Sequence, residues 1–291
     1  DKKDATFRPI VLFRSLYRLH GRLLAAATRD WEKTALGKTP FGNNQGRETL
    51  DSVFRVWVRQ AILLIAGTAR AAADILIDLK KCFEYLSRDL LWKACHDHGY
   101  PMHIARLSLQ TYAWPRLILG QYDYCGKTVV ASGGIAAGSP FVTTELKVYL
   151  LKLARALQVA SGPQAALSIF VDDFSISTVQ ETEEEAAKVI TSTCRLAVQG
   201  LKELKLVVAP DKTELITSSE NLRALIRVDI PTCNLDNCCR KLGVDVNYRK
   251  GVSVNNVIPS TTSGSSPDGR NRFVYSVMPS SMLGTTSVVV C

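Results

Sequence analysis

Two short stretches in which apolar and polar residues alternate stand out along the chain, one on each side of an Asp pair. In residues 167–170 and 174–178, β-branched or aromatic residues alternate with Ser and Thr. A period of two is typical of a β-strand and not of a helix. Because Asp tolerates turn conformations and hydrogen-bonds its own backbone, Asp172 and Asp173 predict a tight hairpin that joins the two strands.

A third strand is predicted nearer to the N-terminus, where residues 73–79 contain the apolar run Ile75-Leu76-Ile77. Such a continuous apolar run is typical of a buried strand. It leads directly to Asp78, and a helical pattern follows. Ligand groups collect at strand ends in architectures that mix helices and strands. We therefore expect the Asp78 carboxylate to lie where chemistry takes place.

Helical periodicity predicts most of the remaining elements. Residues 16–28 are expected to form a helix with Leu16, Leu19, Leu23 and Leu24 on one face. Other helices are predicted at residues 49–72, 87–98, 102–113, 140–160 and 181–205, and other strands at 117–124, 128–132, 206–209, 212–217 and 240–248. From Gly251 on, Ser, Thr, Val, Asn and Gly dominate, which predicts a poorly ordered tail. The fold class predicted is α+β.

Composition adds a charge argument to this pattern. The chain has 291 residues, of which 46% are hydrophobic, which is enough for one or two domains with a sizeable core. Its formal net charge is +9, from 36 Lys and Arg against 27 Asp and Glu. A basic surplus favours a polyanionic partner and says nothing about fold.

The eight cysteines are scattered, and no segment looks like a secretory signal peptide. We therefore expect reduced thiols and an intracellular location, nuclear or cytoplasmic. Cys233, Cys238 and Cys239 cluster, but their spacing does not match a common zinc site. The apolar run at residues 61–67 is too short to span a bilayer, so no membrane partner is expected.

The adjacent carboxylates of Asp172 and Asp173 repel each other unless a cation lies between them. Mg²⁺ takes oxygen ligands and commonly uses one or two carboxylates together with substrate phosphates. An isolated Asp-Asp pair more often marks a solvated turn. Because neighbouring strands lie about 4.8 Å apart, however, Asp78 beside the hairpin would complete a cage of three carboxylates.

In this order along the chain, the motifs resemble the palm of reverse transcriptases, most closely those of retroelements without long terminal repeats and of group II introns. Two of them carry the acids: Asp78-x-x-x-x-Phe83 and Phe170-Val171-Asp172-Asp173. The others are Arg8-Pro9-Ile10, Gln45-Gly46-Arg47-Glu48-Thr49, Gly134-Ile135-Ala136-Ala137-Gly138-Ser139-Pro140, Lys212-Thr213-Glu214 and Leu242-Gly243-Val244-Asp245. The resemblance covers roughly residues 7–247.

The resemblance implies a right-hand polymerase palm, an antiparallel sheet backed by helices, with partial fingers. Residues 1–72 would be the partial fingers, 73–250 the palm with the catalytic motifs, and 251–291 the tail. The implied activity is RNA-templated DNA synthesis by two-metal phosphoryl transfer. The implied cofactors are two Mg²⁺ ions, with Mn²⁺ as the alternative, and the implied partners are an RNA template, a DNA primer and deoxynucleoside triphosphates.

Residue roles follow from the same resemblance. Asp78 and Asp172 would bridge the metal ions, with Asp173 as the weaker third ligand. Lys212 would protonate the leaving pyrophosphate, or merely contact phosphate. The remaining residues would contact nucleotide or nucleic acid: Phe83, Arg8 and Gly138 the nucleotide, and Arg47 and Ser139 the template or primer.

Two other functions stay open at this point. One is a non-catalytic, nucleic-acid-binding remnant of a retroelement, which is favoured by Ala137, because the family usually has Gln there. The other is an RNA-dependent RNA polymerase, which shares the palm. Phe83 favours deoxynucleotides over that alternative, because a flat apolar ring offers no partner to a ribose 2′-hydroxyl.

Overall fold

The computed structural model describes residues 10–37, 39–42, 58, 71–119, 128–230, 239–241, 244–246 and 288–290. Its central feature is an antiparallel sheet of four strands in the order β4-β5-β2-β6. The strands are β2 (Ala71–Ile77), β4 (Ala165–Phe170), β5 (Asp173–Gln180) and β6 (Glu214–Thr217). Strands from three separate parts of the sequence thus lie side by side.

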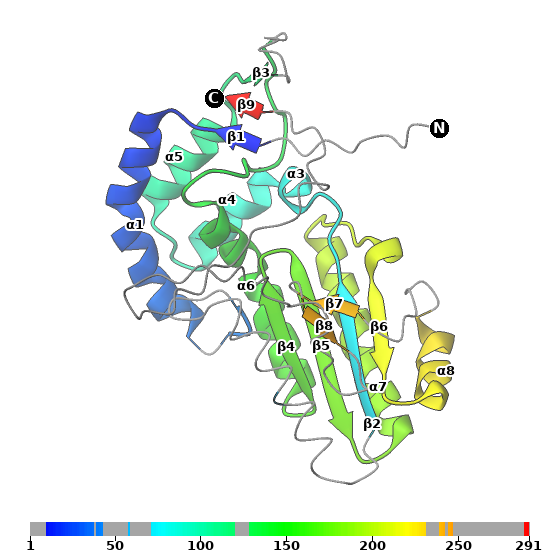
Figure 1. Cartoon of the computed structure of the whole chain (residues 1–291). Helices are drawn as coiled ribbons and strands as arrows, with labels where there is room; N and C mark the ends of the chain where they lie inside the picture. Colours follow the sequence, from blue (N-terminus) through cyan, green and yellow to red (C-terminus); the bar gives the residue numbers. More distant parts are fainter. Residues whose placement is uncertain are drawn as a thin grey trace, which may run out of the picture.

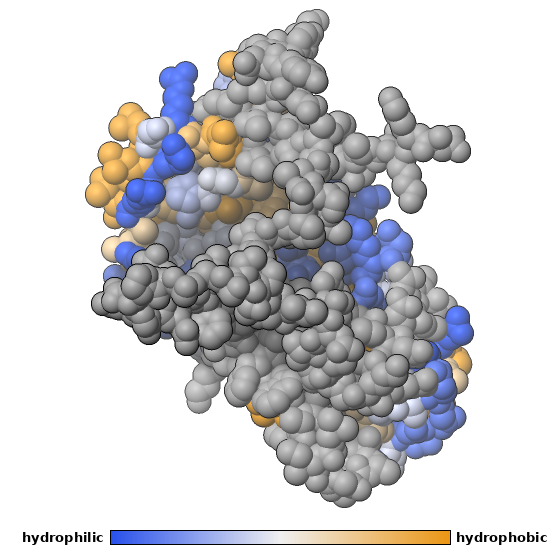
Figure 2. All heavy atoms as spheres, viewed as in Figure 1, coloured by the Kyte–Doolittle hydropathy of each residue, from blue (hydrophilic) through white to orange (hydrophobic). Residues whose placement is uncertain are grey.

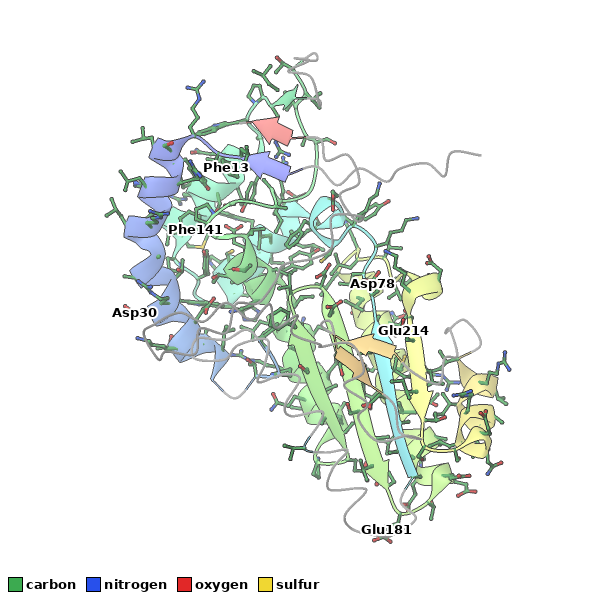
Figure 3. All side chains as sticks on the ribbon, in the orientation of Figure 1. Phe13, Asp30, Asp78, Phe141, Glu181 and Glu214 are labelled. Atoms are coloured by element: carbon green, nitrogen blue, oxygen red, sulfur yellow. The ribbon has the colours of Figure 1, made fainter. Side chains whose placement is uncertain are left out.

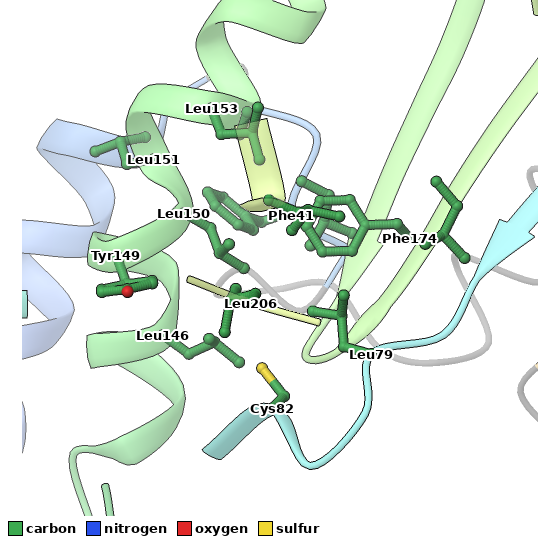
Figure 4. Packing of buried hydrophobic residues seen from close by; sticks show 14 of the residues in the cluster. Phe41, Leu79, Cys82, Leu146, Tyr149, Leu150, Leu151, Leu153, Phe174 and Leu206 are labelled. Atoms are coloured by element: carbon green, nitrogen blue, oxygen red, sulfur yellow. The ribbon is translucent and has the colours of Figure 1, made fainter. Parts of the chain in front are cut away.

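Helices cover one face of this sheet (Figure 1). They are α6 (Val142–Ser161), α7 (Glu183–Glu203) and α8 (Glu220–Asp229). Helix α7 contacts β5 and β2, α6 contacts β4, and α8 contacts β6. Their buried side chains form one hydrophobic cluster with Ile75, Ile77, Phe174 and Ile176 of the sheet, so the main core lies between the two layers. Figure 4 shows the part of this cluster around Leu150 and Phe174.

A second group of elements lies beyond one end of the sheet (Figure 1). It contains the helices α1 (Ser15–Leu36), α3 (Cys82–Tyr85), α4 (Arg88–Asp97) and α5 (Met102–Tyr112). It also contains a small sheet in the order β1-β9-β3, formed by β1 (Ile10–Leu12), β3 (Leu117–Leu119) and β9 (Val288–Val290). Separately, β7 (Cys239–Lys241) and β8 (Val244–Val246) form a hairpin.

A buried ion pair joins α1 to α6. Lys147 Nζ lies 3.1 Å from Glu32 Oε1, and the two side chains are only 5% and 11% exposed. Thr144 donates a second hydrogen bond, of 2.7 Å, to the same Glu32 oxygen. Removing one member of such a pair leaves a buried charge uncompensated, so the pair fixes how the two helices fit together.

The predicted apolar face of the first helix is wrong except at Leu24, which packs against the core. Helix α1 forms, but Leu16, Leu19 and Leu23 are exposed by 79%, 56% and 72%, and apolar surface lies over this part of the molecule in Figure 2. The buried residues are instead Tyr17, Gly21, Thr28, Trp31 and Leu36. At Gly21 a Cβ atom would lie 2.3 Å from Pro140 Cγ, so this face of the helix packs directly on the start of α6.

Other expectations fail in detail. Residues 206–209 form only one bridge, between Val208 and Leu79, and residues 240–248 contain a hairpin where one strand was expected. Of residues 117–124, the described part forms β3, which pairs with β9. An antiparallel bridge between Arg116 and Val129 agrees with the expected pairing to residues 128–132, and residues 120–127 lie outside the described part of the chain. Helix α8 was not predicted.

Of the expected helix at 49–72, Ala71 and Ala72 belong to β2, Val58 is helical, and the rest lies outside the described residues.

Within the part of the chain that the structure describes, no helix is long and apolar enough to cross a membrane.

Candidate active site

The acidic hairpin forms as predicted. Phe170 pairs with Asp173, so Val171 and Asp172 make up the turn between β4 and β5. Val171 has a φ of 57°, a left-handed conformation that is an outlier for a β-branched residue. Strain of this kind costs on the order of 1–3 kcal/mol and is often found at functional sites. The hairpin holds Asp172 at its tip despite that cost.

The strand register brings Asp78 to the same end of the sheet. Ile77 is the last residue of β2 and pairs with Phe174 of β5, so Asp78 and Asp173 are the next residues along their two strands. The Asp78 side chain is 28% exposed. Figure 3 shows Asp78 at one end of the sheet and Glu181 at the other. The hairpin and the strand end, which are far apart in sequence, are therefore neighbours.

Backbone hydrogen bonds extend β2 past its last paired residue and position Lys212. Ala209 N donates to Asp78 O at 2.9 Å, and Lys80 N donates to Val207 O at 2.8 Å. The short 3₁₀ helix Pro210–Lys212 follows at once. It places Lys212 Nζ 3.6 Å from Asp78 Oδ2, with the Lys212 side chain 59% exposed. Lys212 thus lies beside Asp78, the carboxylate that the family resemblance assigned to the same centre.

The donor chemistry suits a hard divalent cation, because Asp78, Asp172 and Asp173 offer carboxylate oxygens at one end of the sheet. Among the described residues, no three His, Cys, Asp or Glu side chains are already arranged to hold a metal ion, so the predicted cage of three carboxylates stays a prediction. The Asp78 carboxylate lies 3.6 Å from the Lys212 ammonium, a cation that offsets part of the local negative charge.

Cys82 is a residue of the site that sequence reasoning missed. It is buried beneath the strand end, beside Leu79, Leu146 and Leu206 (Figure 4). Burial raises the pKa of its thiol to about 12, and the negative charges of Asp172, Glu84 and Asp78 add to the shift. The thiol is therefore neutral and inert. Both Asp172 and Asp78 are close enough to Cys82 to raise the pKa of its thiol, as the pairing of β2 with β5 requires.

Phe83 lies on α3, directly after the strand end. Its side chain is half-buried and packs against the core. Its carbonyl accepts a hydrogen bond of 2.8 Å from Ile135 N, and Gly134 N donates to Leu86 O at 3.2 Å. Gly134 has a φ of 72° and packs so closely that a Cβ atom would lie 2.8 Å from Phe83 O.

In this structure Gly138 and Ser139 contact other parts of the protein. The resemblance assigned them to contacts with the nucleotide and with the template or primer. Gly138 has a φ of 110°, and a Cβ atom there would lie 2.2 Å from Val11 O. The close approach that its missing side chain allows is therefore that of β1, whose Val11 N also donates to Ala137 O at 3.2 Å. Ser139 is only 5% exposed, and its hydroxyl lies 3.4 Å from the Tyr17 hydroxyl.

Glu145 in α6 was also missed. It is 1% exposed, and its carboxyl accepts hydrogen bonds from Ser108 and from Tyr112, the latter at 2.5 Å. Burial raises its pKa to about 7, against the lowering effect of these two bonds. The sequence feature that could have indicated a buried carboxyl is the single Glu within the apolar helix 142–161. The group therefore joins α5 to α6 through its hydrogen bonds with Ser108 and Tyr112.

The Glu residues at the start of α7 have a structural role. Thr182 caps the helix by accepting a hydrogen bond from Glu185 N, and Glu183 accepts hydrogen bonds from Ser219 and Asn221. Arg8 and Arg47 lie outside the described residues, so their predicted contacts remain predictions.

An antiparallel sheet with helices on one face, carrying an Asp hairpin and a strand-end Asp at one end, is the architecture of a polymerase palm. Residues 1–250 match the family described as reverse transcriptase (RNA-dependent DNA polymerase). The chain belongs to that family.

Solved structures of telomerase share this fold. Apo telomerase from Candida tropicalis, truncated from its C-terminal domain, matches 80% of this chain and 44% of its own, at 14% identity and a TM-score of 0.53. Telomerase from the same organism in complex with a TWJ fragment of telomeric RNA matches 88% of this chain and 39% of its own, at 15% identity and a TM-score of 0.54. This chain thus spans less than half the length of these relatives. No curated protein matches it.

Proposed function

We propose that this chain catalyses RNA-templated DNA synthesis at the end of the sheet that carries Asp78 and Asp172. The observation that carries the proposal is the register of β2 and β5, which brings the acids of two distant motifs to one place, with Lys212 beside them. Membership of the reverse transcriptase family supports the reaction class. The motif order further supports an origin in a retroelement without long terminal repeats.

In this proposal Asp78 and Asp172 hold two Mg²⁺ ions, with Asp173 as the weaker third ligand. When bound, the ions would lower the pKa of the primer 3′-hydroxyl and neutralise charge on the triphosphate and the leaving pyrophosphate. Lys212 lies close enough to the same centre to protonate the leaving group or to hold its phosphates. Its contact with Asp78 keeps the ammonium at the centre before nucleotide arrives.

The nucleotide and the template–primer are assigned to the neighbouring elements. Phe83 lies beneath the sugar of the incoming deoxynucleotide, while Arg8 and the Gly138 turn lie toward its phosphates. Arg47 and Ser139 are assigned to template or primer, although the Ser139 side chain is buried and its backbone N–H donates to Ala136 O at 3.0 Å in this structure. Phosphate contacts fix the position of the duplex without reading its sequence. We retain the division into partial fingers, palm and tail as part of this proposal.

Primer extension by the purified chain tests the proposal. We expect Mg²⁺-dependent extension of a DNA primer on an RNA template with deoxynucleotides, abolished by EDTA. Extension with ribonucleotides in preference would identify an RNA polymerase instead. Binding of the template–primer with no extension under any metal would identify a non-catalytic remnant.

A further inference from the structure

Arg88, the first residue of α4, holds a loop to which the proposed function gives no role. Its guanidinium donates to four backbone carbonyls: Nε to Gly134 O at 2.7 Å, Nη1 to Ala131 O at 3.1 Å, and Nη2 to Tyr112 O at 2.8 Å and Gly133 O at 3.0 Å. Three of these acceptors belong to the loop 131–135 and the fourth to the end of α5.

The position of Arg88 is unusual for a cation. Positive charge at the first residue of a helix opposes the helix dipole, which favours acids there and bases at the other end. The planar fork of donors offsets this, because it can bind several carbonyls at once, whereas a lysine presents a single point charge. The geometry therefore depends on the guanidinium and not on charge alone.

The clamped loop lies directly against the residue assigned to the nucleotide sugar. Ile135 N donates to the carbonyl of Phe83, and Gly134 N donates to Leu86 O. Gly134 has no room for a side chain, because a Cβ atom would lie 2.7 Å from Glu84 O and 2.8 Å from Phe83 O. Any shift of the loop would therefore move the backbone that carries the Phe83 ring.

We propose that Arg88 is a positioning residue for sugar selection: its guanidinium locks the loop 131–135 against α3 so that the Phe83 ring stays where it excludes a ribose 2′-hydroxyl. This inference rests on the proposed function, and it names the discrimination between deoxynucleoside and ribonucleoside triphosphates as the property that Arg88 controls. Loss of the fork frees the loop and lets the ring retreat.

Arg88→Lys, which keeps the charge and loses the fork, tests the proposal. Arg116→Lys is the matched control, because Arg116 Nη2 donates to the same Tyr112 carbonyl at 2.8 Å but its side chain makes no recorded bond to residues 131–134. The readout is kcat/KM for dCTP divided by kcat/KM for CTP. We expect this ratio to fall about tenfold in Arg88→Lys, within the range that one pocket contact supplies, and to stay unchanged in Arg116→Lys. Equal losses for both nucleotides would overturn the proposal.

Hydrogen exchange separates this inference from the proposed function. The clamp predicts faster exchange of the Gly134 and Ile135 amides in Arg88→Lys than in the parent chain or in Arg116→Lys, because these amides bond to Leu86 and Phe83. If the parent chain extends no primer, the proposed function has failed, and exchange alone decides the clamp. If the Gly134 and Ile135 amides exchange at an unchanged rate in Arg88→Lys, the clamp proposal is overturned, whether or not the chain extends primers.

Discussion

Phe83 is the residue on which the choice of nucleotide rests. Its ring offers no hydrogen-bond partner to a ribose 2′-hydroxyl, and a buried unpaired hydroxyl costs roughly 1–3 kcal/mol. We expect Phe83→Ala to reduce discrimination between dCTP and CTP by about five- to a hundredfold, at about 1.4 kcal/mol per tenfold, while dCTP use is largely retained. Steady-state kinetics with both nucleotides measure the effect. A variant that rejects CTP as strongly as the parent would remove the gate assignment and favour an RNA polymerase.

The position of Lys212 allows two roles, as general acid for the leaving pyrophosphate or as a phosphate contact. Its ammonium lies 3.6 Å from the Asp78 carboxylate and is largely exposed, so it can reach a leaving group or simply bind phosphate. If it acts as a general acid, Lys212→Leu lowers the single-turnover rate of incorporation by about a hundredfold and changes nucleotide affinity little. Rapid-quench measurements over a range of dCTP concentrations give both quantities. If the variant binds the nucleotide more weakly but incorporates it at an unchanged rate, Lys212 only contacts phosphate and is not the general acid.

At the scale of elements, the turn before α6 depends on contact with β1. Gly138 combines a left-handed φ with a space that the Val11 carbonyl closes. We expect Gly138→Ala to lower the free energy of unfolding by about 3 kcal/mol or more, the upper end of the cost of backbone strain, because the clash adds to the strain. Chemical denaturation measures it.

The control for this prediction is Gly162→Ala. Gly162 also has a positive φ, of 52°, but nothing lies within 4 Å of the position that a Cβ atom would take. This variant should lose only the strain component, about 1–3 kcal/mol, because a φ of 52° with a ψ of −141° is a conformation that an Ala residue rarely adopts. Equal losses in the two variants would mean that β1 does not pack on the turn as described.

The buried carboxyl of Glu145 gives the packing between α5 and α6 a pH dependence. Its pKa rises from 4.5 to about 7 on folding, so between these values the folded chain binds the proton more tightly than the unfolded chain. Stability is therefore greatest below pH 4.5 as far as this group is concerned, and it falls as pH rises toward 7. A shift of this size corresponds to about 3 kcal/mol.

Glu145→Gln removes the titration and keeps a side chain that can bond to Ser108 and Tyr112. We expect the pH profile of the variant's unfolding free energy to lack this fall, so that the variant gains on the parent between pH 5 and about 7. Denaturation of both proteins across that range decides it. Parallel profiles would show that Glu145 is ionised throughout or is not buried.

At the scale of the whole molecule, local patterns were enough to predict most elements but not how they meet. The hairpin and β2 follow from short patterns in the sequence, and both are confirmed. Their side-by-side position depends on pairing between distant strands, which no local pattern encodes. The sequence suggested it only through the carboxylates that end the two segments and through the family resemblance. Similarly, the leucines of α1 made a plausible core face, but the close contact between Gly21 and Pro140 decides which face is buried.

The central claim is that Asp172 takes part in catalysis at a centre shared with Asp78. The most direct test is the rate of primer extension by Asp172→Asn beside Asp30→Asn, a matched change at an exposed acid of α1. We expect Asp172→Asn to lower the rate by about a thousandfold or more, some 4 kcal/mol of transition-state stabilisation, with an unchanged melting temperature. Asp30→Asn should retain the parent rate. Near-normal extension by a folded Asp172→Asn protein would contradict the account.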